Sequence, residues 1–146
     1  MWPFKRKKWE KLGNTYTGVA VREQIRLKLK SELIIIRDKD YRAIPRKDFE
    51  QILFDCWFPK DLPGYVEEKF DCDDYAICCI ASVKLRWAKI SKGKQALPFG
   101  YISAYIGTGH HGFVWAMDNM GEMWLYEPQT GQRIEKKIGK VTLVET

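Results

Sequence analysis

The sequence lacks the segments that mark exported and membrane-spanning chains. Its longest aliphatic run, Leu33 to Ile36, is far shorter than the roughly 20 apolar residues of a membrane span. The residues that follow Phe4 are basic and then polar, without the apolar stretch of about 7 to 15 residues that a secretory signal contains. We therefore predict a cytoplasmic protein without a transmembrane segment.

Cysteine and histidine are also scarce, with four and two residues respectively. Cys78 and Cys79 are adjacent, which argues against a disulfide framework and predicts reduced thiols. Together with Cys72 they miss the spacing of about two to four residues that is typical of paired zinc ligands. No glycine-rich phosphate loop connects a predicted strand to a helix. The sequence therefore disfavours a disulfide scaffold, a zinc site and nucleotide hydrolysis.

Length and composition are those of one domain. The 146 residues are 45% apolar and 14% aromatic, which is enough to bury a single core. The net charge of +6 is concentrated near the start, at Lys5, Arg6, Lys7, Lys8 and Lys11. We predict a basic tail at residues 1–13 and one domain at residues 14–146. Such a tail contacts nucleic acid or an acidic partner through nonspecific electrostatics, or is simply solvated.

The first half of the domain contains two candidate strand segments and one predicted helix. Residues 14–31 show a period-two alternation at Ile25, Leu27 and Leu29, which favours an edge strand or an irregular arm. Residues 33–36 form a β-branched run that suits a buried strand or the end of a helix. A helix is expected to begin near Pro45 and to end before Pro59.

The second half predicts a long helix followed by strands. A helix is expected over residues 71–89, because its apolar residues recur three or four positions apart. These residues form one apolar stripe along the helix, and Cys72 is the first of them. Strands are expected at residues 99–106, 112–117, 123–126 and 141–144. The overall expectation is an α/β (α+β) domain in which the Cys72 helix packs on a small antiparallel sheet.

The turn at residues 118–121 fixes the register of one hairpin. Asp118 at its first position and Gly121 at its fourth favour a type I turn with a left-handed glycine, so that Asp118 pairs with Glu122. Counting back from this pair places one set of residues on a single face of the ribbon: His111, Phe113, Trp115, Met123, Leu125 and Glu127. We expect this face to pack on the Cys72 helix and to bring thiol, imidazole and carboxylate together.

These three groups predict a nucleophilic site. A cysteine attacks as the thiolate, and a helix N-terminus together with an imidazolium lowers its pKa. Cys72 is therefore the candidate nucleophile and His111 the base, with His110 as the alternative base. Glu127 is placed to orient the histidine.

Three aspartates complicate this electrostatic picture. Asp71, Asp73 and Asp74 flank Cys72, and their charges oppose thiolate formation unless they cap backbone amides, face solvent or bind a cation. We expect at least one of them to cap the helix. Carboxylate oxygens also suit calcium, although no loop with recognisable calcium-binding spacing is present.

Three segments resemble known cysteine peptidases. Residues 70–76, Phe-Asp-Cys-Asp-Asp-Tyr-Ala, resemble the helix start of transglutaminase-like and papain-like cysteine peptidases of bacteria and phages. Residues 109–115, Gly-His-His-Gly-Phe-Val-Trp, supply the histidine-led strand, and residues 125–131, Leu-Tyr-Glu-Pro-Gln-Thr-Gly, look most like the C-terminal protease domain of the fairy-ring mushroom agglutinin and its stand-alone bacterial and phage relatives. The resemblance covers roughly residues 33 to 131.

The resemblance implies a papain-like fold, a bacterial or phage-encoded protein, and a triad of Cys72, His111 and Glu127. It also implies a calcium role for Asp73 and Asp74, although no cofactor is required for the chemistry itself. The doubled histidine departs from the family pattern and keeps His110 open as the base. The backbone amide of Cys72, together with Gln129, would form the oxyanion hole.

Two functions follow as hypotheses. The first is a cysteine hydrolase or acyl transferase, in particular a peptidase, that cleaves protein or peptide amides through an acyl-enzyme. The second is a catalytically weak or inactive module of the same fold that binds or inhibits a host or partner protein. The retained cysteine, histidine and glutamate favour the first, and the surrounding aspartates favour the second.

Overall fold

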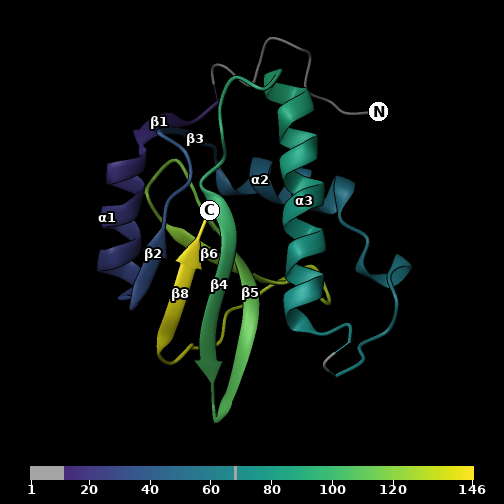
Figure 1. The fold of residues 1–146 in the computed structure, drawn as a ribbon. Coiled ribbons are helices and arrows are strands. Elements are labelled where there is room, and N and C mark those ends of the chain that lie inside the picture. Colours follow the sequence, from purple (N-terminus) through teal and green to yellow (C-terminus); the bar gives the residue numbers. More distant parts are fainter. Residues whose placement is uncertain (1–11, 68) are drawn as a thin grey trace.

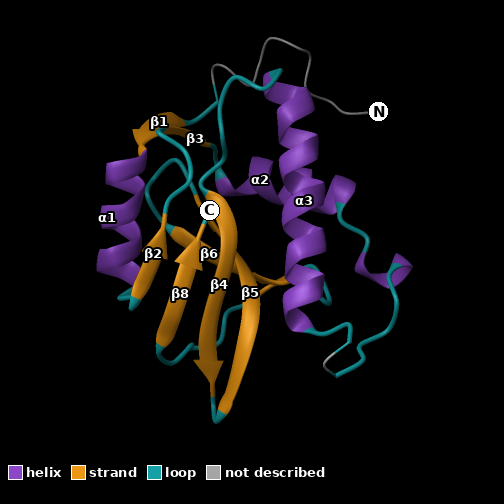
Figure 2. Cartoon of the chain, viewed as in Figure 1, coloured by secondary structure: helices purple, strands orange, loops and turns teal. Residues whose placement is uncertain are grey.

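A six-stranded sheet organises the chain and carries helices on both of its faces (Figures 1 and 2). The computed structural model describes residues 12–67 and 69–146. The elements are β1 Asn14–Thr17, α1 Gly18–Leu29, β2 Leu33–Ile35, β3 Asp40–Ala43, α2 Arg46–Cys56, the 3-10 helix η2 Pro59–Asp61, α3 Cys72–Ser91, β4 Phe99–Ile106, β5 Gly109–Met117, β6 Met123–Glu127, β7 Gln132–Arg133 and β8 Val141–Glu145.

The sheet is almost entirely antiparallel. Its strand order is β2-β8-β4-β5-β6-β7, and only β2 runs parallel to its neighbour β8. Strands β1 and β3 form a separate antiparallel pair. Strands β4 and β5 pair along their whole length, from Phe99 opposite Ala116 to Ile106 opposite Gly109. This pair therefore forms the centre of the sheet.

Each face of the sheet has its own apolar core. On one face, Val114, Ala116 and Tyr126 pack with the buried residues of α2 and α3. On the other face, Phe113 and Trp115 pack with the buried residues of α1. Because neighbouring residues of a strand point to opposite faces, β5 contributes alternate side chains to both cores.

Most of the predicted elements are confirmed. The predicted helix near Pro45 is α2, with Pro45 at its N-cap, and the predicted helix over residues 71–89 is α3. The four predicted strands correspond to β4, β5, β6 and β8. Asp71 caps α3, and Asp74 completes a capping box, as expected for at least one of the aspartates. The coarse prediction of a mixed α/β domain is confirmed.

The prediction for residues 14–31 is wrong over most of its length. Only Asn14–Thr17 form a strand, and helix α1 follows. Thr17 caps this helix by accepting a hydrogen bond from the amide of Ala20. Val21 and Ile25, four residues apart, are fully buried, whereas Leu27 is exposed. The apparent period of two came from including Leu27, which does not face the core.

Two further strands were not predicted. Strand β3 was not predicted because charged residues alternate with its buried Tyr41 and Ala43. Strand β7 was not predicted because it has only two residues. The sequence allowed either a strand or the end of a helix at residues 33–36, and the structure has strand β2 there. Its residues are only partly buried, since β2 lies at the edge of the sheet and Leu33 is exposed.

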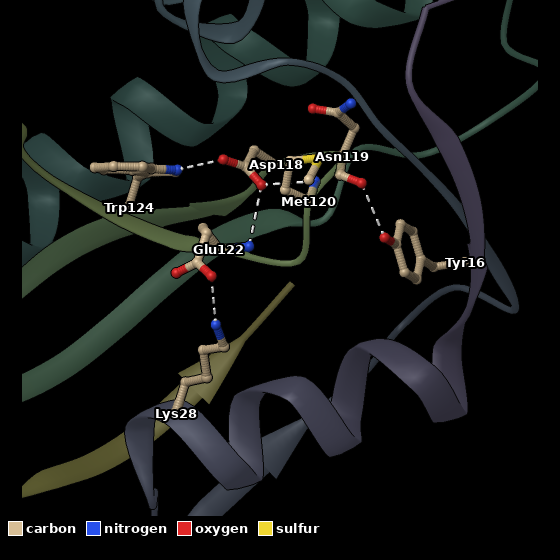
Figure 3. Close-up of polar contacts among 7 residues, drawn as sticks. All are labelled: Tyr16, Lys28, Asp118, Asn119, Met120, Glu122 and Trp124. Atoms are coloured by element: carbon tan, nitrogen blue, oxygen red, sulfur yellow. Dashed lines mark hydrogen bonds and ion pairs between the residues drawn. The ribbon is translucent and has the colours of Figure 1, made fainter.

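The predicted β5–β6 turn is confirmed, and the buried side chain of Asp118 organises it (Figure 3). The amide of Asp118 donates to Glu122 O, and Gly121 has φ +78°. One carboxylate oxygen of Asp118 accepts from the amides of Met120 at 2.8 Å and Glu122 at 3.0 Å, and the other accepts from Trp124 Nε1 at 2.7 Å. The turn is therefore held by its own first residue.

The turn also ties the sheet to the N-terminal elements. Asn119 O accepts from the Tyr16 hydroxyl, and Glu122 pairs with Lys28 of α1 at 2.9 Å (Figure 3).

The packing predicted for the hairpin is wrong. The face that carries Phe113 and Trp115 packs on α1, not on the Cys72 helix α3. The opposite face, with Val114 and Tyr126, covers α3. The register was correct, but register alone does not decide which face of a ribbon a helix covers when both faces are apolar.

The sequence predicted that the chain lacks a transmembrane segment and that it begins with a basic tail. Within the described residues, no helix combines the length and apolar character that crossing a membrane requires. The basic residues of the predicted tail up to Lys11 lie outside the described residues.

We predict that Asp118→Ala lowers the free energy of unfolding by about 2 to 4 kcal/mol, because three donors lose their buried acceptor. The measurement is urea denaturation followed by circular dichroism. Glu122→Gln in the same turn is the control, since it removes only an exposed ion pair with Lys28 and should cost less than about 1 kcal/mol. Equal midpoints for the two variants would contradict the role of Asp118.

Candidate functional site

The N-terminus of α3 lies against the start of β5. The amide of Gly112 donates to Cys72 Sγ at 3.4 Å. A side chain at position 112 would overlap Asp73 Oδ1 and the ring of Tyr101, so that only glycine allows this close approach. Asp73 Oδ1 accepts a hydrogen bond from the Tyr101 hydroxyl at 2.7 Å. Helix α3, β4 and β5 thus meet at four residues.

The electrostatics at Cys72 favour the neutral thiol. Partial burial raises the pKa of Cys72, the hydrogen bond from Gly112 lowers it, and the negative charges of Asp73 and Asp71 raise it again. The net shift is upward. A thiol with a raised pKa is a poor nucleophile near neutral pH.

The hydrogen bonds and ring contacts of the two histidines in the described part of the chain are with residues other than Cys72. His111 lies beside Phe113 of the same strand, with ring centroids 5.9 Å apart, and so faces the α1 side of the sheet. The side chain of His110 points to the opposite face, where its Nε2 lies 2.8 Å from Ser103 Oγ and 3.1 Å from Thr142 Oγ1. Across the described part of the chain, neither ring is hydrogen-bonded to Cys72.

Glu127 and His111 are brought together, although no hydrogen bond joins them. Both line a cavity of about 620 Å³ that also includes Phe113 and Arg133. Glu127 Oε1 accepts from the amide of Gln129 at 3.0 Å, so the carboxylate holds the bend that follows β6. The structure therefore groups two of the three predicted residues and leaves Cys72 outside their cavity.

The aspartates beside Cys72 have structural partners. Asp71 accepts from the amide of Asp73, and Asp74 accepts from the amide of Asp71. In the described ranges, no group of three or more His, Cys, Asp or Glu side chains is placed to hold a metal ion. Calcium at Asp73 and Asp74 therefore stays a prediction. The Asp73 carboxylate already accepts from the Tyr101 hydroxyl and the Cys72 thiol, and the Asp74 carboxylate accepts from the amide of Asp71.

A groove of about 470 Å³ lies beside Asp73, between α3 and strands β4 and β8. Its apolar lining on α3, named the floor below, consists of Ile77, Ile80 and Ala81. Polar and charged side chains surround this floor: Arg37, Asp73, Lys84, Tyr101 and Glu145.

One feature of the sequence does point to this groove, although it entered none of the predictions above. Ile77 and Ala81 lie four residues apart on α3, outside the buried stripe, and both are exposed. An apolar pair on the exposed face of a helix indicates a surface that contacts something else.

Comparison with known proteins gives structural matches alone. No protein-family model and no curated protein matches the sequence. The structure of PSL1a in complex with E64 superposes with a TM-score of 0.71 at 19% identity, over 90% of this chain and 50% of that one. A structure of Polyporus squamosus lectin bound to Neu5Acα2-6Galβ1-4GlcNAc superposes with a TM-score of 0.66 at 20% identity, over 89% and 49%.

The chain shares its fold with about half of that lectin. This finding corrects the sequence-based assignment. The matched structures are those of a lectin, whereas the sequence predicted a papain-like cysteine peptidase acting on proteins or peptides. The raised pKa of Cys72, and the lack of a hydrogen bond between its thiol and either histidine in the described residues, agree with the correction. The predicted peptidase activity, and with it the alternative of an inactive papain-like inhibitory module, is not upheld.

We predict that Cys72 reacts slowly with iodoacetamide at about pH 6, because an ordinary thiol is then less than about 1% thiolate. Peptide mass spectrometry gives the rate at each cysteine, and the unfolded chain provides the reference rate. His110→Ala and His111→Ala should leave the rate at Cys72 unchanged. E64, the compound in the PSL1a complex, serves as a second reagent. Fast modification confined to Cys72 and lost with either histidine would contradict this prediction and restore an activated nucleophile.

Proposed function

We propose that this chain is a carbohydrate-binding module and that its ligand lies in the groove between α3, β4 and β8. The observation that carries the proposal is the composition of the groove. Three apolar side chains, Ile77, Ile80 and Ala81, line the groove together with charged and hydroxyl-bearing side chains.

This composition suits a sugar. A sugar ring presents C–H groups on its faces and hydroxyl groups around its rim, so it needs apolar contact below and hydrogen-bonding partners at the sides. Asp73 and Glu145 accept hydrogen bonds, Arg37 and Lys84 donate them, and Tyr101 offers the edge of an aromatic ring. Binding sites for small molecules generally combine an apolar lining with a few convergent polar groups in this way.

The likeness to Polyporus squamosus lectin supports the proposal, because that protein binds a sialylated trisaccharide. This chain spans about half the length of both matched structures. The likeness to that lectin therefore suggests the class of ligand but does not locate a binding site on this chain. The position proposed here rests on the groove alone.

We predict that Ala81→Phe weakens glycan binding at least about tenfold, equivalent to about 1.4 kcal/mol. Ala81 is exposed on the groove floor, so a phenylalanine there fills the groove without disturbing the core. Ala88→Phe is the matched control, because Ala88 is also exposed on α3 but lines a different cavity. Binding of the trisaccharide Neu5Acα2-6Galβ1-4GlcNAc and of its asialo disaccharide is measured by NMR titration.

Shift changes that map to α3, β4 and β8 and disappear with Ala81→Phe would support the proposal. If no glycan binds the wild-type chain, the proposal is wrong.

A further inference from the structure

We infer that the last turns of α3 form a docking surface for an anionic lipid bilayer. This surface, named the lysine face below, consists of four exposed side chains: Leu85, Ala88, Lys89 and Lys92. None of these four residues lines the groove between α3, β4 and β8. The inference therefore goes beyond the proposed glycan binding and does not depend on it.

A line of exposed apolar side chains runs along α3 and ends at the lysine face. Four exposed apolar residues follow one another at intervals of four, four and three residues: Ile77, Ala81, Leu85 and Ala88. Such intervals place side chains above one another on one helix face. Ile77 is 62% exposed and Leu85 66%. A continuous apolar line of this kind differs from the scattered apolar residues of an ordinary surface.

Lysines border the end of this line. Lys89 follows Leu85 by four residues, and Lys92 follows Ala88 by four, so each lysine neighbours an apolar residue on the helix surface. The ion pairs between described residues involve other cations of the chain. Apolar side chains bordered by lysines are typical of helices that lie on anionic membranes. The apolar groups enter the headgroup boundary, and the long lysine side chains reach the anionic headgroups.

The charge of this part of the chain is almost entirely positive. From residue 75 to residue 117 the sequence contains five Lys or Arg residues and no Asp or Glu. Asp38 approaches from another segment, since it lines a small cavity together with Ala88. Arg37 and Lys39 flank Asp38 in the sequence and offset its charge. This end of α3 is therefore complementary to a negatively charged surface.

The described chain begins near the lysine face. Asn14 of β1 lies opposite Ala43 of β3. Arg42, the residue before Ala43, donates from Nε to Gln95 Oε1 at 2.8 Å, and Gln95 follows Lys92 by three residues. Strands β1 and β3 lie toward the same end of the molecule as the end of α3 (Figure 1). The basic segment of residues 1–11 is therefore attached at this end.

The composition of that segment suits the same partner. It carries five cations and one carboxylate, together with Trp2, Phe4 and Trp9. Tryptophan is enriched at membrane–water interfaces, and clustered Lys and Arg residues attract anionic lipids. Stable membrane association generally needs two signals of this kind acting together. The lysine face supplies the second one.

The apolar line favours a bilayer over nucleic acid. Nucleic acids are bound through cations, polar donors and aromatic stacking, to which an exposed leucine contributes nothing. The same leucine gains free energy when it enters the headgroup boundary of a bilayer. Binding of nucleic acid is therefore the alternative outcome that the test has to separate.

The test measures binding of the full chain to vesicles that contain no glycan. Cosedimentation gives the partition coefficient for vesicles of phosphatidylcholine alone and for vesicles with about one-third phosphatidylserine. The wild type is expected to bind the anionic vesicles at least about tenfold more tightly, and the binding should weaken as the ionic strength rises.

Lys89→Gln combined with Lys92→Gln should weaken this binding about tenfold or more, since each basic residue near an anionic membrane contributes about fivefold. The matched control is Lys136→Gln combined with Lys137→Gln. It removes the same charge from two exposed lysines between β7 and β8 and should change the binding less than about twofold.

Leu85→Gln should weaken the binding at least about threefold, because it removes apolar surface from the contact. Leu27→Gln is its control, since Leu27 is 58% exposed on α1. Circular dichroism of each variant verifies that it is folded.

Equal binding to the two kinds of vesicle would overturn the inference. Unchanged binding by both α3 variants would also overturn it and would assign vesicle binding to the N-terminal segment. The same holds if the wild type binds a single-stranded RNA oligonucleotide but not the anionic vesicles. Because the vesicles carry no glycan, each of these results leaves the proposed glycan binding intact, and failure of the glycan titrations leaves the lysine face intact.

Discussion

The burial of β5 on both faces is the constraint on which the rest of the structure depends. Residues 112–118 are buried without interruption, with α3 covering one face and α1 the other (Figure 1). Alternate side chains of one strand therefore belong to two different cores. This separates His111 from Cys72, since the imidazole follows the α1 face while the thiol comes from the helix on the other face.

The residues at the start of α3 suggested a catalytic role in the sequence, but in the structure they stabilise the fold. Asp71 and Asp74 form a capping box, and Asp73 holds the hydroxyl of Tyr101. Their charges stabilise a helix N-terminus, but they also disfavour the thiolate form of Cys72. A helix that begins with three aspartates is well capped, and for the same reason its first cysteine is poorly activated.

Helix α3 has a buried side and a second apolar side that the sheet does not cover. Tyr75, Val83 and Trp87 complete the core. Ile77 and Ala81 form the floor of the groove and end beside Lys84. The groove also contains the ion pair of Arg37 with Glu145 and the hydrogen bond from the Tyr101 hydroxyl to Asp73.

The sequence alone determined the local structure. The apolar spacing after Asp71 fixed helix α3, and Asp118 with Gly121 fixed the turn and the register of β5 with β6, because these features depend on neighbours in the chain. Tertiary structure decided the rest: that residues 18–29 form a helix, that the face bearing His111 meets α1, and that Arg37, Lys84 and Glu145 surround one groove. These outcomes depend on contacts between distant segments, and when both faces of a ribbon are apolar, only the packing of the whole chain determines which helix covers each face.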